Sequence, residues 1–313
     1  MEKKIVSRDP TIVVPFAGVC DTPRCQDIFV YLRPESNGIA VESALMKGVS
    51  KVPNWQENIN LVYLANLPGD FLNEHGVIEE HYLTRVKFAK SGKSLFTPYM
   101  EMIFSNFYRV NFEESKIIGA FDALHLLGLN EDELFSLWVA MDDMLVLNGQ
   151  TIKKVGKYFI VNSDIPAILN KNNGKTDIAV MIFRTLFWGD DFYNVILKMT
   201  DVLVEEGILN SQSQFSHVFH YSKGPFEQIL DAIGFLYDPT GKHLPLQSIR
   251  FYNFLLGKGL SPLEINHFIK QPLLQFKNRE GYIEEKSIFQ VTKDLGYEES
   301  WEIIRSATAQ VLL

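Results

Sequence analysis

His220 is the residue of this chain whose surroundings in the sequence best fit a chemical role. It lies in the run His217-Val218-Phe219-His220-Tyr221-Ser222, which follows an alternating segment and precedes an amphipathic helical pattern. A histidine can accept a phosphoryl group when one ring nitrogen is free to attack and a hydrogen bond holds the other. Hydrogen-bond donors must also stabilise the negative charge that spreads over the phosphoryl oxygens. We therefore take His220 as the candidate nucleophile.

Two other interpretations of this run are possible from the residues alone. Side chains alternate between the two faces of a strand, so His217 and His220 face opposite sides and do not hold one ion together. We therefore assign no metal site to the protein side chains. The alternative for His220 is a partly buried histidine with a backbone partner, and this alternative stays open.

The run and two upstream segments together resemble the nucleoside diphosphate kinases. In that family a strand closes with Asn-x-x-His-Gly-Ser, the histidine carries a phosphoryl group, and a helix ending near Ile-Gly-Leu-Trp-Phe follows. Here the corresponding helix ends Ala232-Ile233-Gly234-Phe235-Leu236-Tyr237. The segment Ile28-Phe29-Val30-Tyr31-Leu32-Arg33-Pro34-Glu35 stands where the family has a strand ending Lys-Pro-Asp, and Glu80-His81-Tyr82 stands where it has Glu-His-Tyr.

The resemblance implies a role for each of five residues. His220 would be the phosphoacceptor, and Ser222 would take the place of the family's serine. Arg33 would replace a lysine that binds the terminal phosphates, so a planar guanidinium group would stand in place of a compact ammonium charge. Tyr82 would donate to a phosphate or orient the histidine, and His217 occupies the position of the family's asparagine in the substrate site. The activity would be γ-phosphate transfer from ATP or another nucleoside triphosphate to a diphosphate, with Mg²⁺ on the phosphates.

Several of the family's site residues have no counterpart here. The family's two arginines are missing: the helix predicted over 116–127 contains none, and Asn210 stands in the turn before the last strand. Tyr221 replaces the glycine that follows the histidine. One donor to a developing charge is typically worth about 3–4 kcal/mol. The alternative function is therefore a catalytically degenerate protein of the same fold that acts as a binding or scaffold module.

The elements that position these residues follow from hydrophobic periodicity. Apolar residues predict a strand over 28–32, a helix over 39–49 and a strand over 61–64. Alternation predicts a third strand over 85–89, and Pro98 opens a helix that runs to 107. This order is the start of a ferredoxin-like βαββαβ unit.

Later segments carry two further local signals. Asn130 precedes three acidic residues and predicts a capped helix start, and Asn148-Gly149 predicts a tight hairpin turn. We expect His81 at the surface. The fold class is α+β, a ferredoxin-like core with an inserted α/β subdomain and a helical C-terminal region. If so, the strand from Asp27 and the strand with His220 must lie in one sheet.

The domain boundaries follow from these elements. We expect an N-terminal arm (1–26), the first part of the core (27–128), an inserted subdomain (129–210), the second part of the core (211–241) and a wholly helical tail (242–313).

Composition limits the partners and the compartment. A formal net charge of −8 and 46% hydrophobic residues predict a globular protein that binds neither nucleic acid nor membrane. The chain has two cysteines, Cys20 and Cys25, which predicts a reducing, cytoplasmic location. They are ordinary thiols or one half of a metal site. A homo-oligomer, and a protein partner for the insert or the tail, stay open.

Overall fold

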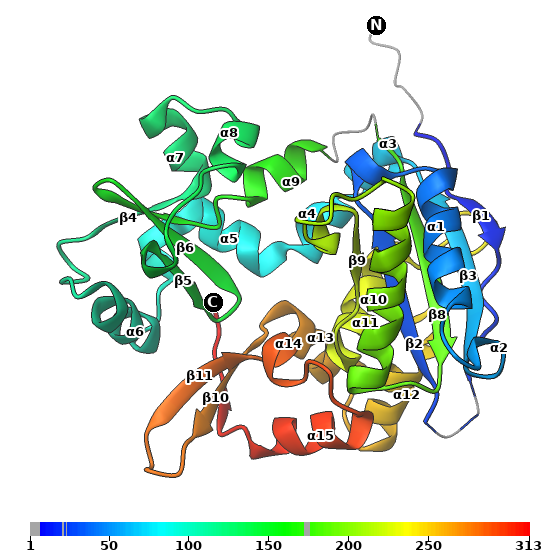
Figure 1. Cartoon of the computed structure of the whole chain (residues 1–313). Coiled ribbons are helices and arrows are strands. Elements are labelled where there is room, and N and C mark those ends of the chain that lie inside the picture. The colour runs from blue at the N-terminus through cyan, green and yellow to red at the C-terminus, as the bar shows by residue number, and fades with distance from the viewer. Residues whose placement is uncertain (1–6, 21, 23, 172–175) are drawn as a thin grey trace, which may run out of the picture. The chain divides into compact units, whose positions relative to one another are not determined.

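The chain divides into two compact units, each built from three stretches of sequence. The computed structural model describes residues 7–20, 22, 24–171 and 176–313 (Figure 1). The first unit comprises Met1–His81, Asn172–Ile265 and Thr292–Glu302, and the second Tyr82–Lys171, Asn266–Val291 and Ile303–Leu313. Both contain sheets and helices, so the protein is of mixed α+β class. None of the helices in the described ranges is long and apolar enough to cross a membrane.

A five-stranded sheet in the order β1-β3-β8-β2-β9 forms the centre of the first unit, and all neighbouring strands are antiparallel. Its strands are β1 (Thr11–Val14), β2 (Gln26–Leu32), β3 (Ile59–Leu67), β8 (Ile178–Thr185) and β9 (Phe219–Tyr221). All seven residues of β2 are buried, as its continuous apolar run predicts. Although β1 lies in the expected N-terminal arm, it is the edge strand beside β3.

The predicted meeting of the two motif-bearing strands is confirmed. β2 pairs directly with β9, and Tyr31 lies opposite His220. The strand that carries His220 has only three residues, because a 3-10 turn, η4 (Phe215–His217), precedes it.

Helices cover both faces of this sheet. On one face α1 (Ile39–Ser50) and α10 (Gly189–Glu205) lie side by side over the even-numbered residues of β2 (Figure 1). A Cβ atom on Gly48 would lie 2.5 Å from the Cα of Met199, so this glycine sets how closely the two helices approach. On the other face α11 (Pro225–Phe235) packs against β2 through Phe235, whose ring lies 4.8 Å from that of Tyr31.

The other helices of the first unit are short, and some of them lie in the sequence near the boundaries of this unit. These are η1 (Pro34–Ser36), α2 (Trp55–Asn58), α3 (Gly69–Glu74), α4 (Val77–His81), η5 (Leu246–Ser248), α12 (Arg250–Gly257), α13 (Pro262–Lys270) and α15 (Tyr297–Ser306).

The second unit contains two smaller sheets. One has the order β4-β7-β6-β5, with β4 parallel to β7, and the other has the order β11-β10-β12. The strands are β4 (Lys116–Gly119), β5 (Met144–Leu147), β6 (Gln150–Val155), β7 (Tyr158–Val161), β10 (Leu273–Lys277), β11 (Ile283–Ser287) and β12 (Ala309–Gln310). The helices are α5 (Leu83–Ser91), η2 (Gly92–Leu95), α6 (Pro98–Tyr108), α7 (Ala120–Leu127), α8 (Glu131–Phe135), η3 (Met141–Asp143), α9 (Ile165–Lys171) and α14 (Ile288–Val291).

Three secondary-structure predictions were wrong. Residues 85–89 form part of helix α5, because their buried side chains fill two hydrophobic clusters of the second unit. The helix predicted over 116–127 begins with the strand β4, which pairs with β7. The tail 242–313 is not wholly helical, since β10, β11 and β12 form a sheet within it. In addition, 178–205 belongs to the first unit and supplies the strand β8 and the helix α10 there.

Candidate active site

His220 lies on the edge strand β9 and faces the side of the sheet that α11 covers. Its neighbours Phe219 and Tyr221 face the hydrophobic cluster under α1 and α10, so alternation turns His220 to the opposite side. About a fifth of its side-chain surface (22%) is exposed. The ring lies 5.0 Å from the ring of Tyr31 at an interplanar angle of 35°. The imidazole is thus held by packing while one part of it reaches solvent.

A carboxylate and two cations surround the His220 ring. Its Nε2 lies 3.9 Å from Oε2 of Glu227, in the first turn of α11. Burial, and then the positive charges of Arg33 and Lys223, lower the pKa of His220 well below its ordinary value. The ring is therefore neutral at neutral pH, which leaves a lone pair for nucleophilic attack.

Burial also raises the pKa of Glu227, while the backbone N–H and the charge of Lys223 oppose this shift. The N–H of Lys223 donates to Oε2 of Glu227 at 2.7 Å. This contact holds the carboxyl group at the start of the helix that follows β9. The turn itself depends on Gly224, because a Cβ atom there would lie 2.5 Å from the carbonyl oxygen of Thr292.

A second carboxyl group lies deeper on the same helix. The side chain of Asp231 is 1% exposed, and its Oδ2 accepts a hydrogen bond of 2.6 Å from the Ser222 hydroxyl. Burial, and then the charge of Glu227, raise the pKa of Asp231 well above its ordinary value, although the bond from Ser222 opposes the shift. The neutral acid is therefore the favoured form. The same serine oxygen accepts the backbone N–H of Phe29 at 3.1 Å.

His81 is buried beside this network, not at the surface as predicted. Its side chain is 5% exposed, and its Nε2 lies 3.3 Å from the Tyr31 hydroxyl and 3.6 Å from Oδ1 of Asp231. Burial, and then the charge of Arg33, lower the pKa of His81 to about 3. The prediction failed because a polar residue between two glutamates and a tyrosine has the local pattern of a surface residue. In the structure the helix that carries His81, α4, packs against α11, and this packing buries the His81 side chain.

The structure brings together three of the five predicted site residues, namely Arg33, His220 and Ser222. Arg33 follows β2, and its Nε donates to the carbonyl of Ser216 at 3.2 Å. His217 is exposed in η4, where its carbonyl accepts a bond from Ser36. Tyr82 belongs to the second unit and packs in a hydrophobic cluster there.

Sequence reasoning missed the two acids of α11, Glu227 and Asp231. They are four residues apart, so they lie on one face of a helix, and this helix begins directly after the strand with His220. That spacing was the available signal.

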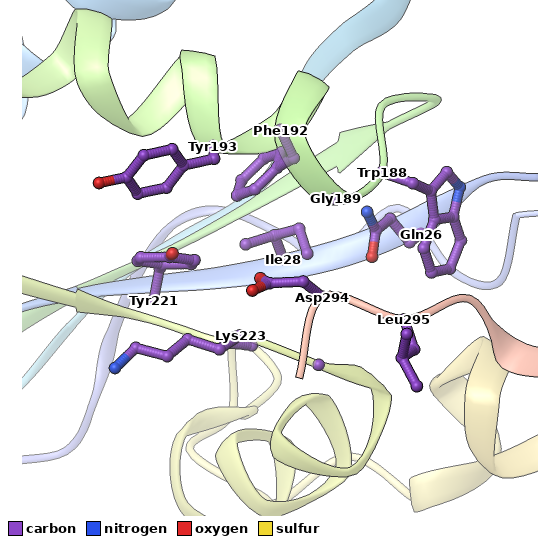
Figure 2. Close-up of a pocket in the computed structure, with 12 residues that line it drawn as sticks. Gln26, Ile28, Trp188, Gly189, Phe192, Tyr193, Tyr221, Lys223, Asp294 and Leu295 are labelled. Atoms are coloured by element: carbon purple, nitrogen blue, oxygen red, sulfur yellow. The ribbon is translucent and has the colours of Figure 1, made fainter. Parts of the chain in front are cut away.

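A small pocket lies on the opposite face of the same sheet (Figure 2). It encloses about 310 Å³ including its open mouth. Phe192 and Tyr193 at the start of α10 face Tyr221 and Ile28 of the sheet, and Asp294 lies at its centre (Figure 2). Because Ile28 and Tyr221 face away from the side of His220, the pocket does not contain the candidate nucleophile.

Within the ranges that the structure describes, no three His, Cys, Asp or Glu side chains gather as metal ligands. Comparisons with protein-family models, with curated proteins and with solved structures gave no match. The function is therefore argued from the geometry around His220.

Proposed function

We propose that the first unit has a ferredoxin-like core similar to that of the nucleoside diphosphate kinases. The connectivity supports this proposal. Strand β2, helix α1 and strand β3 are followed by strand β8, helix α10 and strand β9, and the strands lie in the order β3-β8-β2-β9. This is a βαββαβ unit in which the large insertion lies between the second and third strands. The third strand is then β8, not the predicted segment 85–89.

We further propose that His220 accepts a phosphoryl group from a magnesium-bound nucleoside triphosphate. The observation that carries the proposal is a neutral, partly exposed imidazole with a carboxylate near one nitrogen and two cations close by. Glu227 at 3.9 Å is beyond hydrogen-bond distance, but such contacts commonly shorten when substrate binds. When the N–H of Nε2 donates to the Glu227 carboxylate, Nδ1 keeps the lone pair that attacks.

The transfer takes place in two half-reactions. The lone pair of Nδ1 attacks the γ-phosphorus, the bond to the bridging oxygen breaks, and the nucleoside diphosphate leaves with the electron pair. Arg33 and Lys223 stabilise the negative charge of the phosphoryl oxygens. A terminal phosphate oxygen of a second nucleoside diphosphate then attacks the phosphorus, and the P–N bond breaks with its electron pair returning to Nδ1, which restores the neutral ring.

The test is phosphorylation of the full chain with radiolabelled ATP and Mg²⁺. A phosphohistidine gives a label that is lost in acid and stable in base, because protonation cleaves the P–N bond. We expect this label in the wild type and in the matched control His217→Ala, whose substituted side chain is exposed. His220→Ala loses it. Absence of label at millimolar ATP, with an unchanged circular dichroism spectrum, refutes the phosphotransfer proposal.

One observation favours the second candidate function, a binding or scaffold module of the same fold. Glu227 brings a carboxyl group close to the ring, and part of the Arg33 guanidinium is used on the Ser216 carbonyl. A carboxylate beside a phosphoryl group is repulsive. A protein that binds nucleotide tightly but takes up no label fits this function. Protein partners and a homo-oligomer are then the next properties to measure.

A further inference from the structure

The pocket between α10 and the five-stranded sheet combines aromatic walls with the carboxylate of Asp294. All the residues that line it belong to the first unit. The rings of Phe192 and Tyr221 are each 4% exposed, and their centroids lie 6.0 Å apart. Tyr193 is 44% exposed. The Asp294 carboxylate points toward Tyr221 (Figure 2). Apolar walls with a few convergent polar groups are typical of a small-molecule site.

Backbone contacts on two sides fix the position of Asp294. Its N–H donates to the carbonyl of Lys223 at 2.7 Å. Its φ angle of 60° lies in the left-handed region, which aspartate and asparagine adopt more readily than most residues. A Cβ atom on Gly189 would lie 3.5 Å from the Asp294 carbonyl oxygen, so the first turn of α10 lies directly against this residue. The carboxylate is therefore held at the pocket by the fold.

The polar atoms of the pocket can accept hydrogen bonds from a ligand. Among the described residues, the hydroxyls of Tyr193 and Tyr221 have no hydrogen-bond partner. Burial, and then the negative charge of Asp294, raise the pKa of Tyr221, so its hydroxyl keeps the proton and its oxygen can accept a bond. Oδ2 of Asp294 lies 3.4 Å from Nζ of Lys293, but both side chains are about half exposed, so this ion pair is weak.

The charges around the pocket favour a cation over an anion. Lys223 also lines the pocket, but its side chain extends away from Asp294 (Figure 2), and its charge acts on Glu227. Two helices begin beside the pocket, and the N-terminal end of a helix is positive. Carboxylates in their own first turns offset this charge, namely Asp190 and Asp191 in α10 and Glu227 in α11. The Asp294 carboxylate therefore remains to attract a ligand.

We propose that this pocket binds a small primary alkylammonium cation. The ammonium group donates to the Asp294 carboxylate and to the hydroxyls of Tyr193 and Tyr221. The faces of the aromatic rings also attract the positive charge, and the alkyl chain packs against Phe192. The pocket, about 310 Å³ including its open mouth, admits a chain of a few carbons. This site is independent of the phosphotransfer at His220, which faces the other side of the sheet.

The test is a titration of the native full chain with n-butylammonium chloride at neutral pH and constant ionic strength, followed by ligand-observed NMR. The matched ligand is 1-butanol, which has nearly the same size but no charge. We expect saturable binding of the ammonium and at least about tenfold weaker binding of the alcohol. Asp294→Asn should weaken ammonium binding at least about tenfold, and asparagine tolerates the same backbone conformation. Tyr193→Ala should weaken it about two- to fivefold.

Asp201→Asn is the matched control variant, because Asp201 is also about half exposed and its Oδ2 also lies near a lysine, 3.1 Å from Nζ of Lys198. This variant removes the same charge and should bind n-butylammonium as the wild type does. Unchanged affinity in Asp294→Asn overturns the proposal. Equal binding of the alcohol and the ammonium by the wild type, or no saturable binding of the ammonium, overturns it as well. The comparison of the two ligands does not depend on how any variant folds.

Discussion

The Ser222 hydroxyl connects the sheet to α11, and its removal should destabilise the first unit. Ser222 is 1% exposed and lies just beyond the last residue of β9. Its oxygen accepts the N–H of Phe29 at 3.1 Å and donates to Asp231 at 2.6 Å. The backbone N–H of Ser222 returns a bond to the carbonyl of Phe29 at 3.0 Å. The side chain therefore completes the pairing of β2 with β9.

The expected cost of Ser222→Ala follows from these two side-chain bonds. A buried donor that loses its partner costs about 1–3 kcal/mol, and a typical net hydrogen bond contributes about 1 kcal/mol. Leaving the Phe29 amide unpaired and losing the bond to Asp231 together predict a loss of about 2–4 kcal/mol in the free energy of unfolding. The alanine fits without steric conflict, so no strain adds to this value.

The assay is urea-induced unfolding at neutral pH, with Ser36→Ala as the matched control. Ser36 also donates one hydrogen bond, to the carbonyl of His217, but this bond is exposed, so its loss should cost about 0.5 kcal/mol or less. If Ser222→Ala is no more destabilising than this control, the Ser222 network does not hold β9 to β2, and the reasoning is wrong.

Three further predictions concern the same unit. Asp231→Asn should stabilise the protein at neutral pH, because the raised pKa of Asp231 means that ionisation of this side chain opposes folding. The gain should disappear as the pH falls below 3.8, where the acid is neutral in both the folded and the unfolded state. Urea-induced unfolding measured across this pH range checks the prediction. Gly48→Ala should lower the free energy of unfolding by about 1–3 kcal/mol, since the added Cβ atom would meet the Met199 backbone. The control Gly257→Ala, whose Cβ atom would have nothing within 4 Å, should be neutral or stabilising. Thermal unfolding of both variants checks this prediction. Arg33→Ala should weaken ADP binding at least about tenfold by calorimetric titration, because charge-assisted bonds to phosphate are lost; unchanged affinity would remove Arg33 from the site.

Local sequence signals determined those elements whose causes lie within a few residues. The apolar run of β2 requires cover on both faces wherever the strand lies, and it is wholly buried. Thr97 and Pro98 begin α6, with the threonine side chain accepting the N–H of Met100, and Asn130 forms a capping box. Asn148-Gly149 supplies the positive φ angles of the turn between β5 and β6. In each case the backbone geometry follows from the residues that adopt it.

The tertiary structure decided what depends on distant partners. The alternation of 85–89 fits a short strand, but Val86, Phe88 and Ala89 are buried on a helix because two clusters of the second unit receive them. A short apolar pattern does not distinguish a strand from a helix, because the free energy of burial depends on which apolar surface the side chains pack against and not on the pattern itself.

The site shows the same division between local and distant causes. The sequence singled out His220, which lies within β9, and Arg33, which directly follows β2, the strand that pairs with β9. It did not identify the burial of His81 or the position of Glu227, because both depend on how α4 and α11 pack on the sheet. The pKa values of these groups depend mainly on burial and on neighbouring charges, which only the folded chain brings together.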